Sequence, residues 1–435
     1  YTATEEDRED WKAQGSITHD FEITSGMDRQ SHTFINFKQS IVTVCKEDTE
    51  GNPIKGWPVG LLTELTGDGD ATGVNGCVDF IISRPDTYKV EEVVQDGWTA
   101  QGPTSYTFDA KSGDEDRLYT FVNFENVEVE VCKEDTEGDP IEDWEVTLEM
   151  GEWSDTKETN ELGCYTWEVT KPGTYTAIEE TRESWTPQGA TTHDFVITSG
   201  MTTQSHTFIN FEKANIKACK TDTEGNPIQG WWIHLNYLDL NMGDAYQTEE
   251  DGCVDIKISI PGNYEVTELN QDYWSPQGPT SYTFDAKSGD EDRLYTFVNF
   301  ENVEVEVCKE DTEGDPIEDW EVTLEMGEWS DTKETNELGC YTWEVTKPGT
   351  YTAIEETRES WTPQGATTHD FVITSGMTTQ SHTFINFENA KITIVKDVTK
   401  EYEIDSENDY IADQEFDVVF DGQSDTIKDY GEGSS

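Results

Sequence analysis

The sequence predicts an all-β protein, a tandem array of antiparallel β-sandwich domains arranged like beads on a string. Three observations support this prediction. The motif VCKEDTEGDPIEDW occurs at residues 131–144 and again at 307–320, and looser copies begin at Val44 and Ala218, so its cysteine returns after 87, 87 and 89 residues. Short segments alternate apolar and polar side chains with a period of two. Glycine- and proline-rich turns separate them, and no stretch carries a sustained helical period.

Five strands are expected in each complete repeat, and the copy at residues 126–212 shows them in order. VEVEVCK comes first and is followed by CYTWEVT, TYTAIEE, HDFVITSG and SHTFINF, with the turns EGDP, KPG, PQG and SGM between segments. Alternation in VEVEVCK places Lys133 on the same face as Val127, Val129 and Val131, whereas Cys132 lies on the other face. A lysine on the core face requires a partner, because lysine is rarely buried alone.

The period also predicts the domain organisation. Each complete repeat is long enough to enclose one hydrophobic core. Residues 101–212 recur unchanged at 277–388, and such uniformity is typical of structural proteins that lengthen by duplication. The predicted units are the C-terminal half of a sandwich at 1–38, complete sandwiches at 39–125, 126–212, 213–301 and 302–388, and the N-terminal half of a sandwich at 389–435.

The charge of the chain excludes some partners. Its 435 residues include 93 Asp and Glu against 28 Lys and Arg. So acidic a surface argues against nucleic acid or an anionic membrane as a partner. No apolar run is long enough to cross a bilayer, so membrane insertion is not expected in this segment. The 14 Trp, 17 Tyr and 18 Phe predict aromatic-rich cores rather than disorder, which is usually poor in aromatic residues.

The eight cysteines form one pair per complete repeat. The first cysteine of each pair lies in the repeated motif and the second follows a glycine. An even pair without CxxC spacing and without neighbouring histidines indicates an intradomain disulfide rather than a metal site. Disulfides place the protein outside the reducing cytosol, extracellularly or on a cell surface. The predicted pairs are Cys45 with Cys77, Cys132 with Cys164, Cys219 with Cys253 and Cys308 with Cys340.

Three further positions carry a resemblance. Lys-x-Asp-x-x-Gly after the first strand, Tyr-x-x-x-Glu in the middle and Asn in the last strand resemble the Cna B-type, or SpaA-like, prealbumin-fold (Ig-like) domains of surface adhesins, pilins and stalk proteins. The resemblance covers nearly the whole chain. It implies an isopeptide bond from the lysine to the asparagine, assisted by the glutamate. The corresponding residues are Lys46, Glu92 and Asn123; Lys133, Glu179 and Asn210; Lys220, Glu268 and Asn299; and Lys309, Glu355 and Asn386.

The residue types suit this chemistry, because burial lowers a lysine pKa and raises a glutamate pKa, giving a neutral amine and a proton carrier. The alternative gives each residue an ordinary role. The lysine then begins a solvated acidic turn, the glutamate belongs to an ordinary acidic pair, and the asparagine caps a strand end.

The two ends of the chain match complementary halves of a repeat. YTATEEDREDW at the start resembles YTAIEETRESW from Tyr175, and KITIVKDVTKEYEID from Lys391 restarts a repeat without its cysteine. Two explanations are open: the chain is part of a longer polypeptide, or the last half docks onto the first half of the next subunit by strand addition, head to tail. In the second case Lys396 of one subunit faces Glu5 and Asn36 of its neighbour.

Other clusters are weaker candidates. Histidines recur in pairs, but other repeats carry tyrosine there, which favours aromatic strand positions over metal ligands or catalytic groups. Acidic turns could hold calcium, although the EF-hand spacing is missing, so no cofactor is expected beyond this weak possibility. Tryptophans could stack on sugars or pack the ends of each sandwich. These residues are His19, His32, His193, His206, His369 and His382; Asp68, Asp70, Asp135, Glu137 and Asp139; and Trp98, Trp144, Trp185, Trp231 and Trp361.

Two hypotheses remain for the function of the chain. The first is an extracellular structural protein, a subunit of a surface filament, fibre or stalk. The alternative is a surface adhesin or a carbohydrate-binding array. No nucleophile elbow, phosphate loop or zinc motif is present, so an enzyme is not expected. The expected partner is the protein itself, head to tail or within a longer chain.

Overall fold

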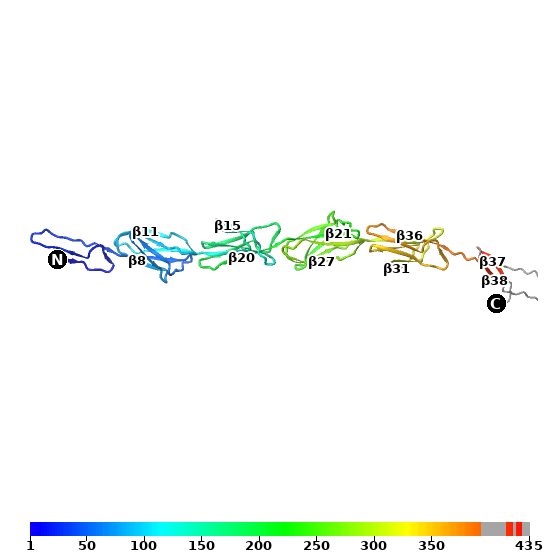
Figure 1. Cartoon of the computed structure of the whole chain (residues 1–435), viewed down its shortest axis with the longest axis horizontal. Coiled ribbons are helices and arrows are strands. Elements are labelled where there is room, and N and C mark those ends of the chain that lie inside the picture. The colour runs from blue at the N-terminus through cyan, green and yellow to red at the C-terminus, as the bar shows by residue number, and fades with distance from the viewer. Residues whose placement is uncertain (393–414, 421–422, 429–435) are drawn as a thin grey trace, which may run out of the picture.

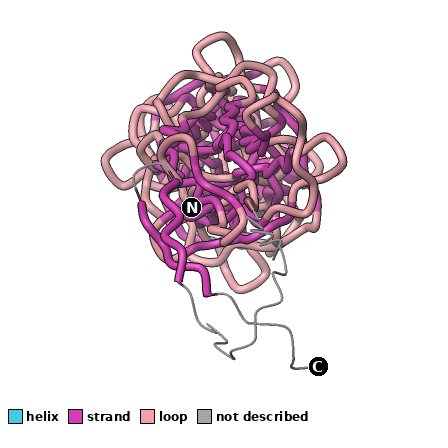
Figure 2. Tube along the Cα trace, turned by 90° about the vertical axis from the view of Figure 1, so that its right-hand side faces the viewer, coloured by secondary structure: helices cyan, strands magenta, loops and turns pink. Residues whose placement is uncertain are grey.

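The computed structural model describes residues 1–392, 415–420 and 423–428, and in this part of the chain every regular element is a strand. Four β-sandwiches follow one another along a nearly straight axis, with the N-terminus at one end (Figure 1). Seen along that axis, the strands lie in the centre and the loops form the rim (Figure 2). The predicted all-β tandem array is confirmed.

Each sandwich contains eight strands in the same order. In residues 126–212 they are β13 (Val127–Asp135), β14 (Glu145–Met150), β15 (Trp153–Glu158), β16 (Cys164–Val169), β17 (Gly173–Glu179), β18 (Trp185–Pro187), β19 (Thr192–Ile197) and β20 (Gln204–Glu212). The preceding sandwich has β5 (Ser40–Glu47), β6 (Pro58–Leu62), β7 (Gly67–Ala71), β8 (Cys77–Ile82), β9 (Asp86–Glu92), β10 (Trp98–Ala100), β11 (Ser105–Ala110) and β12 (Arg117–Glu125).

The next two sandwiches repeat this order. The third contains β21 (Ala214–Asp222), β22 (Trp232–Tyr237), β23 (Met242–Gln247), β24 (Cys253–Ile258), β25 (Gly262–Glu268), β26 (Trp274–Pro276), β27 (Ser281–Ala286) and β28 (Arg293–Glu301). The fourth contains β29 (Val303–Asp311), β30 (Glu321–Met326), β31 (Trp329–Glu334), β32 (Cys340–Val345), β33 (Gly349–Glu355), β34 (Trp361–Pro363), β35 (Thr368–Ile373) and β36 (Gln380–Glu388).

Two four-stranded sheets face each other in every sandwich. One has the order β16-β13-β20-β18 and the other β15-β14-β17-β19. All neighbours are antiparallel except the first and last long strands, β13 and β20, which run parallel. The chain therefore enters and leaves each sandwich on two adjacent strands that point the same way.

The core lies between the sheets, as the alternation predicts. In β13 the three valines are at most 1% exposed, and Trp144, Trp167 and Phe208 pack with them. Burial of apolar surface stabilises such a core by about 25 cal/mol for each Å² removed from water. The other three sandwiches have equivalent clusters.

The sequence predicted five strands per repeat, and three more are present. β15 is wholly exposed or half-buried and forms a sheet edge, so its side chains do not alternate between core and solvent. β14 alternates over six residues but was not recognised, and β18 has only three residues.

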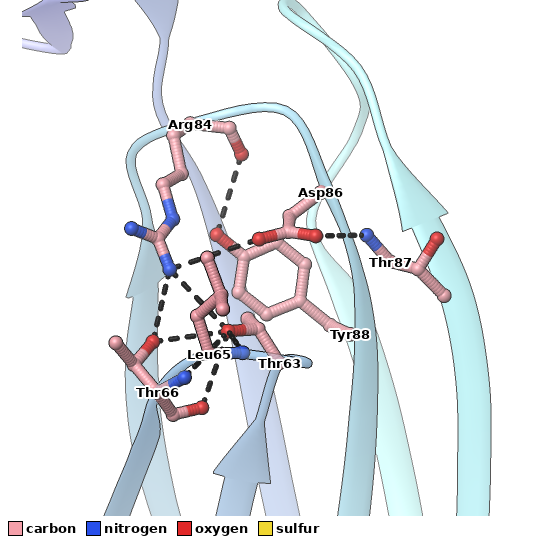
Figure 3. A network of polar contacts seen from close by, with 7 residues as sticks. All are labelled: Thr63, Leu65, Thr66, Arg84, Asp86, Thr87 and Tyr88. Carbon is pink, nitrogen blue, oxygen red and sulfur yellow. Dashed lines mark hydrogen bonds and ion pairs between the residues drawn. The ribbon is translucent and has the colours of Figure 1, made fainter.

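Loops at one end of the first sandwich are joined by polar contacts. The Arg84 guanidinium donates to Thr63 Oγ1 and Thr66 Oγ1 at 3.3 and 2.9 Å and lies 3.7 Å from Asp86 (Figure 3). The Tyr88 hydroxyl donates to the Arg84 carbonyl oxygen. These bonds tie the β6–β7 turn to the loop before β9.

Residues 1–38 form two small pairs of strands. β1 (Thr2–Thr4) pairs with β3 (Thr18–Asp20), and β2 (Trp11–Ala13) pairs with β4 (Asn36–Lys38). Tyr1 is 90% exposed, whereas its equivalent Tyr175 is 3% exposed. Near the other end, β37 (Glu415–Phe420) pairs with β38 (Gln423–Lys428).

Candidate functional site

All eight cysteines are paired as predicted. Cys132 and Cys164 lie directly opposite each other on the antiparallel strands β13 and β16, which is why residues 32 apart in sequence can meet. Each bond closes a loop of about thirty residues and contributes roughly 3 to 4 kcal/mol in the loop-entropy model. The four disulfides are Cys45–Cys77, Cys132–Cys164, Cys219–Cys253 and Cys308–Cys340.

A thiol titration tests this pairing. Protein denatured without a reductant should show no reactive thiol, because every cysteine is bonded. After reduction it should show eight. Eight thiols before reduction would contradict the pairing.

The same strand brings a lysine to the core. Lys133 follows the three valines on the inner face of β13, and Glu179 ends β17 in the opposite sheet. The parallel register pairs Lys133 with Phe208, so Asn210, two residues further along β20, shares that inner face. The first strand, the last strand and the facing sheet thus each contribute one of these three side chains to the inner face of the sandwich.

Lys133 and Glu179 are in contact, and these two side chains and that of Asn210 are almost fully buried. Lys133 Nζ lies 2.9 Å from Glu179 Oε2, donates to the Phe208 carbonyl oxygen at 3.3 Å, and sits 4.8 Å above the Trp144 ring. The lysine is 0% exposed and Asn210 is 1% exposed. No described group donates a hydrogen bond to Asn210 Oδ1. The lysine therefore does not begin a solvated turn.

The arrangement recurs in all four sandwiches. The lysine Nζ to glutamate Oε2 distances are 3.3, 2.9, 2.8 and 2.8 Å in chain order, and each lysine and glutamate side chain is at most 1% exposed. The residues are those predicted: Lys46, Glu92 and Asn123; Lys133, Glu179 and Asn210; Lys220, Glu268 and Asn299; Lys309, Glu355 and Asn386.

Sequence reasoning did not assign to this site the tryptophan of the repeated motif, which forms one of its walls. It follows the lysine by the same interval each time, and its ring faces the ammonium group at 4.5 to 4.8 Å. That constant interval was the available signal. The four pairs are Lys46 with Trp57, Lys133 with Trp144, Lys220 with Trp231 and Lys309 with Trp320.

Burial is the main cause of shifted pKa values here. It lowers the lysine pKa from 10.5 to about 8 in Lys46 and Lys220, and it also lowers the pKa of Lys133 and Lys309. A lower pKa leaves more of the lysine as a neutral amine with a free lone pair. Burial raises the glutamate pKa, with smaller opposing effects of the lysine and asparagine side chains, in Glu92, Glu179 and Glu268.

These groups are suited to one covalent reaction. A neutral lysine amine can attack the asparagine Cγ, forming an N–Cγ bond while the Cγ–Nδ2 bond breaks. The glutamate can accept a proton from the attacking amine and pass it to Nδ2, which leaves as ammonia. Each site could react once, without turnover.

The predicted site between subunits is only partly described. The Asn36 amide donates to Glu5 Oε1, so these two residues already meet within residues 1–38. Lys396, their predicted partner, lies outside the described residues.

The paired histidines pack as the sequence indicated. His193 and His206 stack at 3.8 Å between ring centroids, and Tyr106 stacks on Tyr119 at 4.9 Å in the equivalent place. The position accepts either aromatic ring, and the two rings stack in both cases.

The tryptophans named as sugar-stacking candidates do not form an exposed strip. Trp144 and Trp231 are at most 1% exposed, and Trp185 packs edge-on against Trp144 at 5.5 Å. Of the calcium candidates, Asp135 Oδ1 already accepts the backbone N–H groups of Glu137 and Asp139 and so closes its own turn.

Comparisons with known proteins give similarity in structure only. No family model and no curated protein sequence matches the chain. Similar solved structures include the TIE protein of Bacillus anthracis, at 15% identity and a TM-score of 0.32 over 80% of this chain and 68% of that one. The major pilin subunit BcpA of Bacillus cereus has 11% identity and a TM-score of 0.32 over 61% of this chain and 100% of that one. A streptococcal ancillary pilin has 12% identity and a TM-score of 0.23 over 60% and 98%. These values do not support a transfer of function.

Within the described residues, no helix combines the length and hydropathy needed to cross a lipid bilayer.

Proposed function

We propose that the chain is an extracellular structural repeat protein, a subunit of a surface filament, fibre or stalk. The observation that carries this proposal is the position of the buried lysine and asparagine. They lie on the two parallel strands through which the chain enters and leaves each sandwich. Tension along the array acts on those two strands first, so a bond between them would resist it.

We infer that the four complete repeats each carry a Lys–Asn isopeptide bond. An unsatisfied buried polar group costs about 1–3 kcal/mol, and a buried ion pair seldom repays the loss of hydration. A site with both features in every repeat is a poor means of stabilising a fold by itself. A cross-link that joins the first and last strands would explain why each repeat keeps a site whose burial costs free energy.

The disulfides support an oxidising location. Each joins the first strand to its antiparallel neighbour, and cysteines in the cytosol are mostly kept reduced. We therefore place the protein outside the cell or on its surface.

The alternative, an adhesin or carbohydrate-binding array, has less support. The tryptophans named above as sugar-stacking candidates lie in the cores or pack against them, whereas Trp153, Trp232 and Trp329 are 43–44% exposed. Near-identical repeats suit a spacer better than a set of binding loops, which concentrate function at variable positions.

Electron microscopy tests the structural function. Gold-labelled antibodies on intact cells that make the protein should label extended appendages along their length. Label confined to the cell interior would contradict the proposal. If the purified chain instead binds specific sugars on a glycan array while no appendage is labelled, the adhesin alternative is correct.

We also propose that residues 1–38 receive complementary strands, either from a second copy that associates head to tail or from a longer chain that contains this one. Residues 1–38 expose side chains whose equivalents in the complete sandwiches are buried, such as Tyr1 at 90% against Tyr175 at 3%. An exposed apolar face with unpaired strand edges favours the addition of complementary strands. Micrographs of the purified chain should show fibres longer than one copy, and single rods at high concentration would contradict this association.

A further inference from the structure

One phenylalanine crosses each joint between neighbouring domains. In β12, Phe121 packs in the core of its own sandwich, whereas Phe124 packs in the core of the next sandwich, against residues such as Val127 and Trp144. The equivalent residues at the other joints also belong to the following core and are at most 1% exposed. They are Phe37, Phe211 and Phe300.

The backbone beside this phenylalanine is held by the following domain. The Glu125 N–H donates to Ser199 Oγ at 2.8 Å, across the joint. Gly200, next to this serine, has φ 72°, which favours glycine, and a Cβ there would lie 3.2 Å from Glu125 Oε2. The same bond occurs from Lys38 to Ser112, from Glu212 to Ser288 and from Glu301 to Ser375.

A second contact runs back across the joint. The Ser199 N–H donates at 3.3 Å to Glu50, which lies in the DTEG turn of the preceding domain. Ser288 donates to Glu137 at 3.0 Å and Ser375 to Glu224 at 3.3 Å. The acidic turn of the repeated motif thus contacts the Ser-Gly loop of the next repeat.

The linker itself is a single residue in the second joint. Asn126 lies between the end of β12 and the start of β13. Its side chain accepts a hydrogen bond from Thr99 in the preceding domain and donates one to Glu168 in the following domain. Bending this joint would break bonds on both sides.

We propose that each sandwich carries a socket for the strand end of the sandwich before it, and that this makes stability directional along the chain. A sandwich keeps its complete core without its follower. The follower, in contrast, loses a core phenylalanine when the preceding sandwich unfolds. The domains therefore form a cooperative rod rather than independent beads, whether or not the Lys–Asn bonds form.

The chain contains its own control for this socket. Phe387 occupies the same position as Phe211, and the strands that carry them, β36 and β20, have identical sequences. Phe387 is 44% exposed, whereas Phe211 is 0% exposed in the core of residues 213–301. Burial of this residue depends on the following domain and not on its own strand.

Hydrogen exchange on the full-length chain tests the proposal. Peptides from residues 214–276 have no copy elsewhere, so they report on one sandwich alone. Phe211→Ala should accelerate exchange of their slowest amides by a factor on the order of a hundred or more, because it empties a core position. Phe211→Leu, which keeps an apolar side chain in the socket, should accelerate it less.

Phe387→Ala should leave these peptides unchanged. Peptides from residues 40–100, which lie upstream and have no copy elsewhere, should exchange as in the unaltered chain when Phe211 is replaced. Unchanged exchange in residues 214–276, or an equal acceleration in residues 40–100, would overturn the proposal.

Discussion

Pulling the chain by its two ends should unfold none of the four complete sandwiches. The substitution Asn299→Ala should allow one of them, residues 213–301, to unfold. The first and last strands of residues 213–301, β21 and β28, are parallel neighbours that a pull would shear apart. A Lys220–Asn299 bond would hold them together and keep the intervening chain out of the load path. With Asn299 replaced and Cys219–Cys253 intact, about 50 residues should be released, roughly 17 nm of extended chain.

Reduction separates the two kinds of cross-link. In the Asn299→Ala chain, a reductant should raise the released length to about 90 residues, roughly 30 nm, because the disulfide no longer shortens the path. In the unaltered chain, reduction should add no step, because the load passes from Cys219 to Lys220 and through the proposed bond to Asn299, and so does not stretch the chain through Cys253. Steps of about 30 nm from the reduced, unaltered chain would contradict the proposed bonds.

Replacing the buried glutamate should have the largest effect on stability. Glu268 is the counter-ion of Lys220, at 2.8 Å, and both are buried. Glu268→Gln removes both the partner charge and the proton carrier, so the bond should not form and a buried lysine should remain unpaired. Loss of one partner of a buried pair typically costs about 3–5 kcal/mol. Hydrogen exchange of peptides from residues 214–276 would measure this loss.

An exposed glutamate in the same sandwich provides the matched control. Glu250→Gln removes one negative charge from the surface and should leave exchange in residues 214–276 unchanged. If Glu268→Gln behaves like Glu250→Gln, the buried glutamate has neither proposed role.

Alternation predicted the parts of this fold that depend on one face meeting the core. The pattern of VEVEVCK places Lys133 inward beside the valines, and the structure confirms this with 0% exposure. Cys132 was expected on the outer face, and it meets Cys164 across neighbouring strands. These features follow from the period of a strand, which the sequence displays directly.

Features that depend on contacts between domains could not be predicted in this way. Phe124 lies an odd number of residues from Phe121, so a period of two assigns it to the outer face of β12. It is nevertheless 0% exposed, because the next sandwich begins there and supplies a second core. The contact made by the Ser-Gly loop could not be predicted either. Ser199 accepts its hydrogen bond from the backbone N–H of Glu125 in the preceding domain, and a backbone donor leaves no pattern in the sequence.

The mass of the intact protein tests the proposed isopeptide bonds most directly. After complete reduction and alkylation, the four bonds predict a mass lower than that of the sequence with its eight cysteines alkylated by four molecules of ammonia. A tryptic digest should then contain a branched peptide joining Lys220 to Asn299, in the repeat whose first strand has no copy elsewhere. A mass equal to that of the alkylated sequence, with Lys220 and Asn299 in separate peptides that are not joined, would contradict the account.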